Sequence, residues 1–94
     1  MVVPYEWEDW ALLGLVGIEP HEVRQVLDSR HRWPRTATDA KTGLQVLTIW
    51  GRTMTGRALI VAVYHVGGLT WKIIGSREPA PAELDEFVRW EETR

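Results

Sequence analysis

LQVLTIWGRTMTGRALIVAVYHVGGLTWKIIGSR, residues 44–77, is the stretch that decides the fold of this chain. It holds three runs rich in Val, Ile, Leu, Thr, Trp and Tyr, which are Leu44–Arg52, Arg57–Val66 and Thr70–Ser76. Thr53–Gly56 and Gly67-Gly68 separate these runs. Short β-branched and aromatic runs divided by glycine-containing turns are typical of β-hairpins. The stretch therefore predicts a three-stranded antiparallel meander.

The lengths of the two turns predict the register of the meander. A two-residue turn at Gly67-Gly68 pairs His65 with Thr70, and a four-residue loop before Arg57 pairs it with Arg52. Side chains alternate along a strand, so each face has a definite membership. One face is then small and apolar and is expected under helices; its members are Leu47, Ile49, Ala58, Ile60, Ala62, Tyr64, Trp71 and Ile73.

The opposite face of the predicted meander mixes cations with apolar residues. It includes Arg52, Arg57, His65 and Lys72 around an apolar centre. Such a face suits a partner surface. The alternative is that these charges sit at strand ends and only keep the sheet soluble.

The segments that flank the meander are predicted to be mainly helical. Acids after Glu8, a proline at position 20 with Glu22 three residues after Glu19, and acids after Pro81 are typical helix starts. The predicted elements are a short extended piece at Pro4–Trp7, helices at Glu8–Val16, Pro20–Ser29 and Pro81–Glu92, and a polar loop at 36–42 with a short edge strand as an alternative. The chain is therefore expected to be one α+β domain over residues 1–94.

Composition narrows the class of protein. The chain has 94 residues, of which 45% are hydrophobic and 26% charged, enough for one modest core. It contains no cysteine, which removes disulfides, thiolate metal sites and thiol nucleophiles. Apolar runs are too short for a membrane span, and the N-terminus lacks the pattern of a signal peptide. We expect a cytoplasmic protein with no membrane partner.

The net charge of −2 conceals a strong internal asymmetry. Residues 29–77 carry eight Lys or Arg against the single acid Asp39, whereas residues 1–28 and 78–94 carry six acids each and only Arg24, Arg89 and Arg94 as cations. A basic sheet beside acidic helices would attract a polyanion to one side of the molecule. The alternative is internal compensation of charge between helices and sheet.

The sequence offers little for metal or nucleotide chemistry. His21, His31 and His65 lie far apart and have no acid at a recognised ligand spacing. Gly67-Gly68 precedes a strand, whereas a phosphate-binding glycine loop opens a helix. We therefore expect neither a metal site nor a cofactor.

The cations and proton-transfer groups of the meander suit metal-free cleavage of RNA. In that reaction the 2′-OH attacks the adjacent phosphate, so the protein must move protons and stabilise charge on the phosphorane. The candidates that would neutralise phosphate are Arg57, Lys72 and Arg77, and those that would move protons are His65, Tyr64 or His31. The alternative for Tyr64 is a packed aromatic residue, and for His65 an exposed strand residue.

A basic segment with an embedded indole precedes the meander. Arg30, His31, Arg32, Trp33 and Arg35, together with Arg52 beside Trp50, are candidate RNA-binding residues. Trp33 and Trp50 suit base stacking or a protein interface because cations flank them. The other indoles, Trp7, Trp10, Trp71 and Trp90, fall at helix or strand spacing and are expected in the core.

Three segments resemble a known family. GIEPHEVRQVLD, GRTMTGRALIVAVYHVGG and WKIIGSREPAPAELDEF are similar to BrnT-type toxins of the RelE superfamily, which have a GR-then-apolar strand and a final strand close to RIISAR before an acidic helix. The resemblance implies a type II toxin–antitoxin toxin that cleaves RNA and is neutralised by a cognate antitoxin, a small DNA-binding protein. It assigns Arg57 to the GR arginine, Lys72 to the basic strand start and Arg77 to the SAR arginine.

Two departures from the family pattern leave other functions open. Leu15-Val16 stands before Gly17 where the family has Lys-His, and Glu78 follows Arg77 where a basic residue is common. A second hypothesis is therefore a catalytically silent domain of the same fold that binds a protein partner or a second copy of itself. A third is a nucleic-acid-binding regulator that uses the basic loop at Arg30–Arg35.

Overall fold

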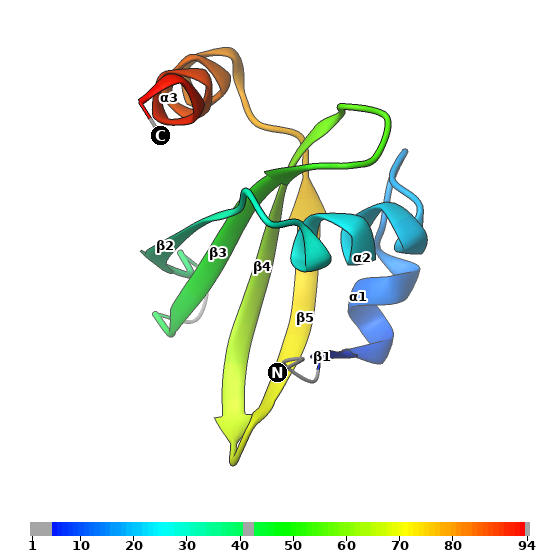
Figure 1. The fold of residues 1–94 in the computed structure, drawn as a ribbon. Helices are drawn as coiled ribbons and strands as arrows, with labels where there is room; N and C mark the ends of the chain where they lie inside the picture. The colour runs from blue at the N-terminus through cyan, green and yellow to red at the C-terminus, as the bar shows by residue number, and fades with distance from the viewer. Residues whose placement is uncertain (1–4, 41–42, 94) are drawn as a thin grey trace.

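The protein is an α+β domain built on one five-stranded sheet (Figure 1). The computed structural model describes residues 5–40 and 43–93, so Pro4, Lys41 and Arg94 lie outside the described residues. The elements in chain order are β1 (Tyr5–Trp7), α1 (Asp9–Leu13), α2 (Pro20–Asp28), β2 (Trp33–Thr38), β3 (Gln45–Arg52), β4 (Ala58–Gly67), β5 (Thr70–Arg77) and α3 (Pro81–Glu92).

The predicted meander forms the centre of a larger, mixed sheet. The strand order is β1-β5-β4-β3-β2, in which β1 runs parallel to β5 and every other pair is antiparallel. The expectation of three strands with one optional edge strand is therefore corrected to five. The strand β1 was expected only as an extended piece, because three residues carry no periodicity that distinguishes a strand from a loop.

Both predicted hairpin registers are wrong by one residue. Arg52 pairs with Ala58 because the first loop has five residues, 53–57, closed by a hydrogen bond from the Thr53 N–H to the Arg57 carbonyl at 2.8 Å. In the second hairpin Gly67 pairs with Thr70 and His65 with Trp71, with a bulge between them. Gly67 and Gly68 both take positive φ, at 131° and 55°, which permits this tight bulged turn.

The two slips turn β4 over relative to its neighbours. A one-residue slip exchanges the faces of a strand, so Leu59, Val61 and Val63 join Ile49 and Ile73 on one face. Ala58, Ile60, Ala62 and Tyr64, which were expected in the helix-covered core with Leu47, Ile49, Trp71 and Ile73, lie on the other face. The observed arrangement places Leu59, Val61 and Val63 in the larger core and Ile60 in a smaller cluster on the other face.

Helices cover both faces of the sheet, but unequally (Figure 1). On the α2-side face the main core comprises Ile18, Val23, Val26, Leu27, Ile49, Leu59, Val61, Val63 and Ile73. On the α3-side face, Trp50 and Ile60 of the sheet pack against Phe87 of α3 in a smaller cluster, which is flanked by Trp33, Ala58 and Trp90. The α3-side face is consequently covered at one end only.

The starts of α2 and α3 follow the predicted helix signals. Pro20 and Pro81 occupy the first turn of their helices. The Glu22 carboxylate accepts from the Glu19 N–H at 3.0 Å, and the Glu83 carboxylate from the Ala80 N–H at 2.8 Å. Each side chain satisfies a backbone donor that the helix itself leaves unpaired.

The first helix differs from its prediction in length and burial. The helix α1 ends at Leu13 with Gly14 as its cap, well before Val16. Trp10 was expected in the core, yet it is 59% exposed, and Leu13 and Val16 are each 87% exposed. The reason is that α1 has only five residues, too few to wrap its apolar side chains around a core.

Candidate functional site

The uncovered part of the α3-side face gathers three of the predicted site residues. Direct cross-strand neighbours on β4 and β5 are Tyr64 and Lys72, Ala62 and Gly75, and Ile60 and Arg77. Thr48 lies beside Ala62 on β3. We call Thr48, Ala62, Tyr64, Lys72, Gly75 and Arg77 the open half of this face.

The open half contains a hollow with a floor of small side chains. Its volume is about 240 Å³, and Thr48, Ile60, Ala62, Gly75, Ser76 and Arg77 line it. Ser76 pairs with Val61, so its side chain belongs to the α2-side face, where its hydroxyl is buried without a hydrogen-bond partner among the described residues. A shallow recess with one guanidinium at its edge can accept a group about the size of a phosphate.

The other half of this face is an aromatic cluster under α3. The Trp33 ring stacks on Trp90 and Phe87, with centroids 5.3 Å and 6.5 Å apart, and meets the edge of Trp50 at 5.5 Å. The Arg35 guanidinium lies 4.5 Å from the Trp33 centroid and 5.1 Å from that of Trp50. Trp33 and Trp50 are thus brought together, but α3 occupies their ring faces.

Each arginine of this face is paired with an acid of α3. Arg35 contacts Glu86. Arg52 bonds Glu91 through two nitrogens, both at 2.9 Å, and Arg77 bonds Glu83 at 2.6 and 2.9 Å. The bond from Arg77, aided by the Ala80 N–H, lowers the pKa of Glu83 to about 2. Glu91 likewise raises the pKa of Arg52, and Glu83 that of Arg77.

Lys72 and Tyr64 belong to a second polar group at the β1 edge. The Lys72 ammonium lies 3.4 Å from Glu6 and 3.7 Å from Glu8. The Tyr64 hydroxyl donates to the Glu8 carboxylate at 3.4 Å. Glu6 is the main cause of a raised pKa of Lys72. Tyr64 is only partly buried, so it is not a core aromatic residue.

Arg57 lies at the end of the sheet and faces α2. Its guanidinium bonds both oxygens of Glu22, at 3.0 and 3.2 Å, and reaches Glu78 at 3.4 Å. Glu78 and Glu22 together raise the pKa of Arg57. Arg57 therefore contacts the helix on the opposite side from the one that Arg77 contacts. The structure does not bring these two arginines to one face.

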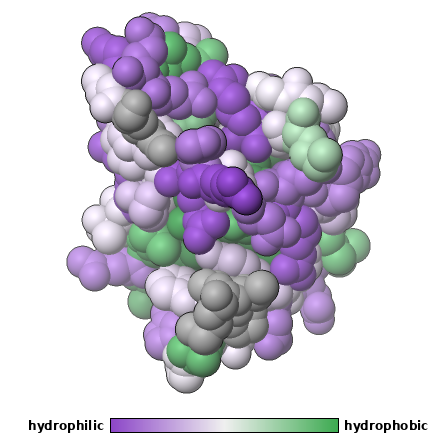
Figure 2. All heavy atoms as spheres, in the orientation of Figure 1, coloured by the Kyte–Doolittle hydropathy of each residue, from purple (hydrophilic) through white to green (hydrophobic). Residues whose placement is uncertain are grey.

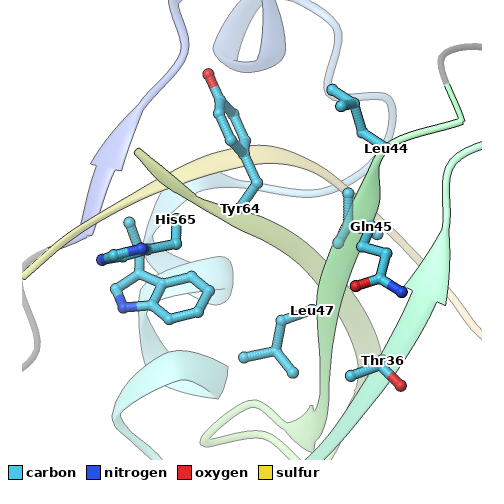
Figure 3. Close-up of a pocket in the computed structure, with 8 residues that line it drawn as sticks. Thr36, Leu44, Gln45, Leu47, Tyr64 and His65 are labelled. Carbon is cyan, nitrogen blue, oxygen red and sulfur yellow. The ribbon is translucent and has the colours of Figure 1, made fainter. Parts of the chain in front are cut away.

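His65 points to the face opposite Tyr64. Its ring lies 4.9 Å from that of Trp71, and its Nε2 is 2.6 Å from the Gly68 carbonyl oxygen. Figure 3 shows His65 and Tyr64 among the side chains that line a second hollow, with Tyr64 directed away from Leu47 and Thr36. The volume of this hollow is about 330 Å³. In the view of Figure 2, apolar side chains are visible at the surface between hydrophilic groups. His65 and Tyr64 both line this second hollow, but neither of them lines the hollow beside Arg77.

The basic loop before β2 is used partly to terminate α2. Arg32 donates to the carbonyl oxygens of Leu27 and Ser29, at 3.1 and 3.0 Å, and so satisfies two groups at the helix end. His31 donates its N–H to Ser29 Oγ at 3.2 Å. Arg30 is exposed. This loop is separate from the open half.

Sequence reasoning missed the residues that shape the open half and its cover. Thr48, Ala62 and Gly75 were missed because the register was wrong by one residue. The acids Glu83, Glu86 and Glu91 were counted as a charge excess, but they recur with Phe87 and Trp90 at helical spacing. That mixed acidic and aromatic stripe indicates a helix that packs on a basic, aromatic surface.

Comparison with models of known protein families and with curated proteins found no match. Among residues 5–40 and 43–93, no group of three or more His, Asp or Glu side chains is placed to hold a metal ion. No helix of the described chain has both the length and the apolar composition needed to cross a membrane.

Proposed function

We propose that this chain is the toxin of a type II toxin–antitoxin pair and cleaves RNA without a metal ion. The observation that carries the proposal is the placement of Arg77, Lys72 and Tyr64 on one face of the sheet. Arg77 lines a hollow of about 240 Å³ floored by Ala62 and Gly75, and Tyr64 and Lys72 form a directly opposed pair further along the same two strands. The resemblance to BrnT-type toxins independently assigns Arg77 and Lys72.

The proposed chemistry uses the 2′-OH of the RNA as nucleophile. Arg77 and Lys72 neutralise the phosphate and the charge that builds up on the phosphorane. Tyr64, whose hydroxyl is 3.4 Å from the Glu8 carboxylate, transfers the proton between the attacking and leaving oxygens. Tyr64 takes this role rather than His65, because His65 faces the other side of the sheet.

The acids beside these cations do not prevent phosphate from binding. The side chain of Arg77 is 59% exposed, and exposed ion pairs contribute only about 0–1 kcal/mol. A phosphate can therefore exchange with Glu83 at Arg77. The affinity for RNA should fall with ionic strength, because salt weakens the attraction between these cations and the phosphates. The nearby acids repel the RNA backbone and lower the affinity further.

Cleavage of a labelled RNA by the purified protein in EDTA tests the proposal. Arg77→Ala is expected to lower the rate about 100-fold through loss of phosphorane stabilisation. Lys72→Ala and Tyr64→Phe are expected to lower it at least about tenfold. Arg24→Ala, an exposed cation on α2, is the control and keeps the rate. Intact RNA with the folded wild-type protein overturns the proposal.

The toxin function also requires a neutralising partner. Expression of the chain alone is expected to arrest growth, and co-expression of its cognate antitoxin, a small DNA-binding protein, is expected to restore it. Arg77→Ala should be tolerated without the partner. Normal growth of cells that accumulate the folded wild-type chain would contradict this part of the proposal.

A second candidate function is a catalytically silent domain that binds a protein. The observation that favours it is charge compensation: Arg35, Arg52, Arg57, Lys72 and Arg77 each pair with an acid from outside the meander. Trp10, Leu13 and Val16 also expose apolar surface, as an interface would. Tight capture of one protein partner, or a stable homodimer, together with no RNA turnover selects this candidate.

A further inference from the structure

The helix α3 is attached to the sheet by side chains at one end of the α3-side face. Figure 1 shows it across the ends of β2 and β3, joined to β5 by the extended segment 78–80. Phe87 is its buried residue, and Phe87 and Trp90 stack on Trp33. The helix can therefore move away from the sheet without breaking any strand pairing.

The surface beneath α3 has the composition of a single-strand nucleic-acid site. It presents two indoles, Trp33 and Trp50, with Arg35 close to both rings. Arg52 ends the same strand as Trp50, and its guanidinium lies 5.6 Å from the Phe87 centroid of α3. Aromatic rings on which bases stack, interleaved with cations for phosphates, are the standard means of binding single strands. This surface is continuous with the open half through Arg77 and Thr48, whose hydroxyl bonds the Arg35 carbonyl at 2.8 Å.

The helix covers this surface with groups of matching chemistry. Its carboxylates bond the arginines: Glu83 with Arg77, Glu86 with Arg35 and Glu91 with Arg52. Its rings, Phe87 and Trp90, occupy the stacking face of Trp33. Carboxylates thus stand where phosphates would lie, and aromatic rings stand where bases would lie.

We infer that α3 masks a binding surface for single-stranded RNA formed by Trp33, Trp50, Arg35 and Arg52, and that RNA competes with the helix for it. This inference rests on the proposed function and extends it. The open half supplies the cleavage site, and the masked surface binds the neighbouring nucleotides once α3 is displaced. The chain in the closed arrangement is expected to bind RNA weakly.

Two double variants of equal charge test the inference in the full chain. Glu86→Gln with Glu91→Gln removes two carboxylates that face the sheet. Asp85→Asn with Glu92→Gln removes two exposed carboxylates of the same helix that form no ion pair with a described residue. The probe is a fluorescent 12-nucleotide 2′-O-methyl RNA, which lacks the nucleophile and so measures binding without cleavage.

The expected result is a dissociation constant at least tenfold lower for the sheet-facing variant and within twofold of wild type for the control. An equal gain in both variants shows a simple charge effect and overturns the inference, as does no gain in either. Phe87→Ala loosens the helix without changing the charge and should tighten binding in the same direction. Circular dichroism verifies that each variant is folded.

Cleavage measured on the same proteins separates this inference from the proposed function. If the wild type cuts RNA but the sheet-facing variant gains no affinity for the probe, the inference that α3 covers an RNA-binding surface is wrong, while the proposed nuclease function is supported. If the sheet-facing variant gains affinity but neither it nor the wild type cuts RNA, the inference about α3 is supported and the proposed nuclease function is wrong.

Discussion

Val61 shows most clearly how one residue depends on the register of the hairpins. It is fully buried in the α2-side core, whereas its neighbour Ala62 lies on the opposite face beside Gly75. The register predicted from sequence placed the two residues the other way round. The register depended on the length of the first loop. The sequence is compatible with a loop of four residues, 53–56, and with a loop of five residues, 53–57.

Val61→Ala is expected to lower the free energy of unfolding by about 2 kcal/mol, because it removes two buried methyl groups from a packed core. Val66→Ala, at a half-exposed position of the same strand, is the control and should cost less than about 0.5 kcal/mol. Urea unfolding of the two variants measures both. Equal effects would show that Val61 is not in the core.

Glu83 gives a prediction about pH. Its pKa is lowered to about 2 from 4.5, chiefly by Arg77. A carboxyl whose pKa is lower in the folded state stabilises the protein fully above pH 4.5, and this contribution is lost as the pH falls towards 2. Glu83→Gln should therefore cost up to about 1 kcal/mol at pH 7, a small value because the pair is partly exposed.

Urea unfolding at several pH values tests whether the contribution of Glu83 to stability is lost as the pH falls. The difference in unfolding free energy between wild type and Glu83→Gln should shrink from pH 4.5 to pH 2. Glu92→Gln, which removes an exposed acid of the same helix, is the matched control for the loss of one carboxylate. A difference that stays constant down to pH 2 would mean that the Arg77–Glu83 pair does not stabilise the fold.

Gly51 and Gly75 differ in how closely other elements pack against the sheet at their positions. A Cβ at Gly51 would lie 3.1 Å from Val26 Cγ1, where α2 crosses β3, whereas a Cβ at Gly75 would meet nothing within 4 Å. Gly51→Ala should cost about 1–3 kcal/mol through overpacking. Gly75→Ala should change the free energy of unfolding by less than about 0.5 kcal/mol. Thermal or urea unfolding compares them, and equal costs would contradict the described α2–β3 contact.

Elements with strong local signals were predicted well, and those without were not. The helices α2 and α3 were found from Pro20, Pro81 and their capping acids, and the meander from its glycine turns. The strand β1 was not recognised as a strand of the sheet, because its pairing with β5 depends on residues about 65 positions away. The length of α1 failed because Gly14, rather than Gly17, ends it.

At the scale of the whole molecule, the basic meander and the acidic flanks compensate each other. The sequence predicted the asymmetry of charge but could not decide between a surface for a polyanion and internal pairing. The structure pairs the sheet arginines with helix acids, and three of these acids belong to α3. The two interpretations are compatible if α3 is the element that an RNA displaces.

The location of bound RNA tests this account most directly. Addition of a 2′-O-methyl RNA to the isotope-labelled protein, followed by amide chemical shifts, should perturb Ala62, Gly75 and Arg77 in the open half, together with Trp33 and α3. Val23 and Val26, under the other face, should stay unchanged. No perturbation, or perturbation confined to the Arg30–Arg32 loop and the α2 side, would contradict the assignment of the α3-side face to RNA.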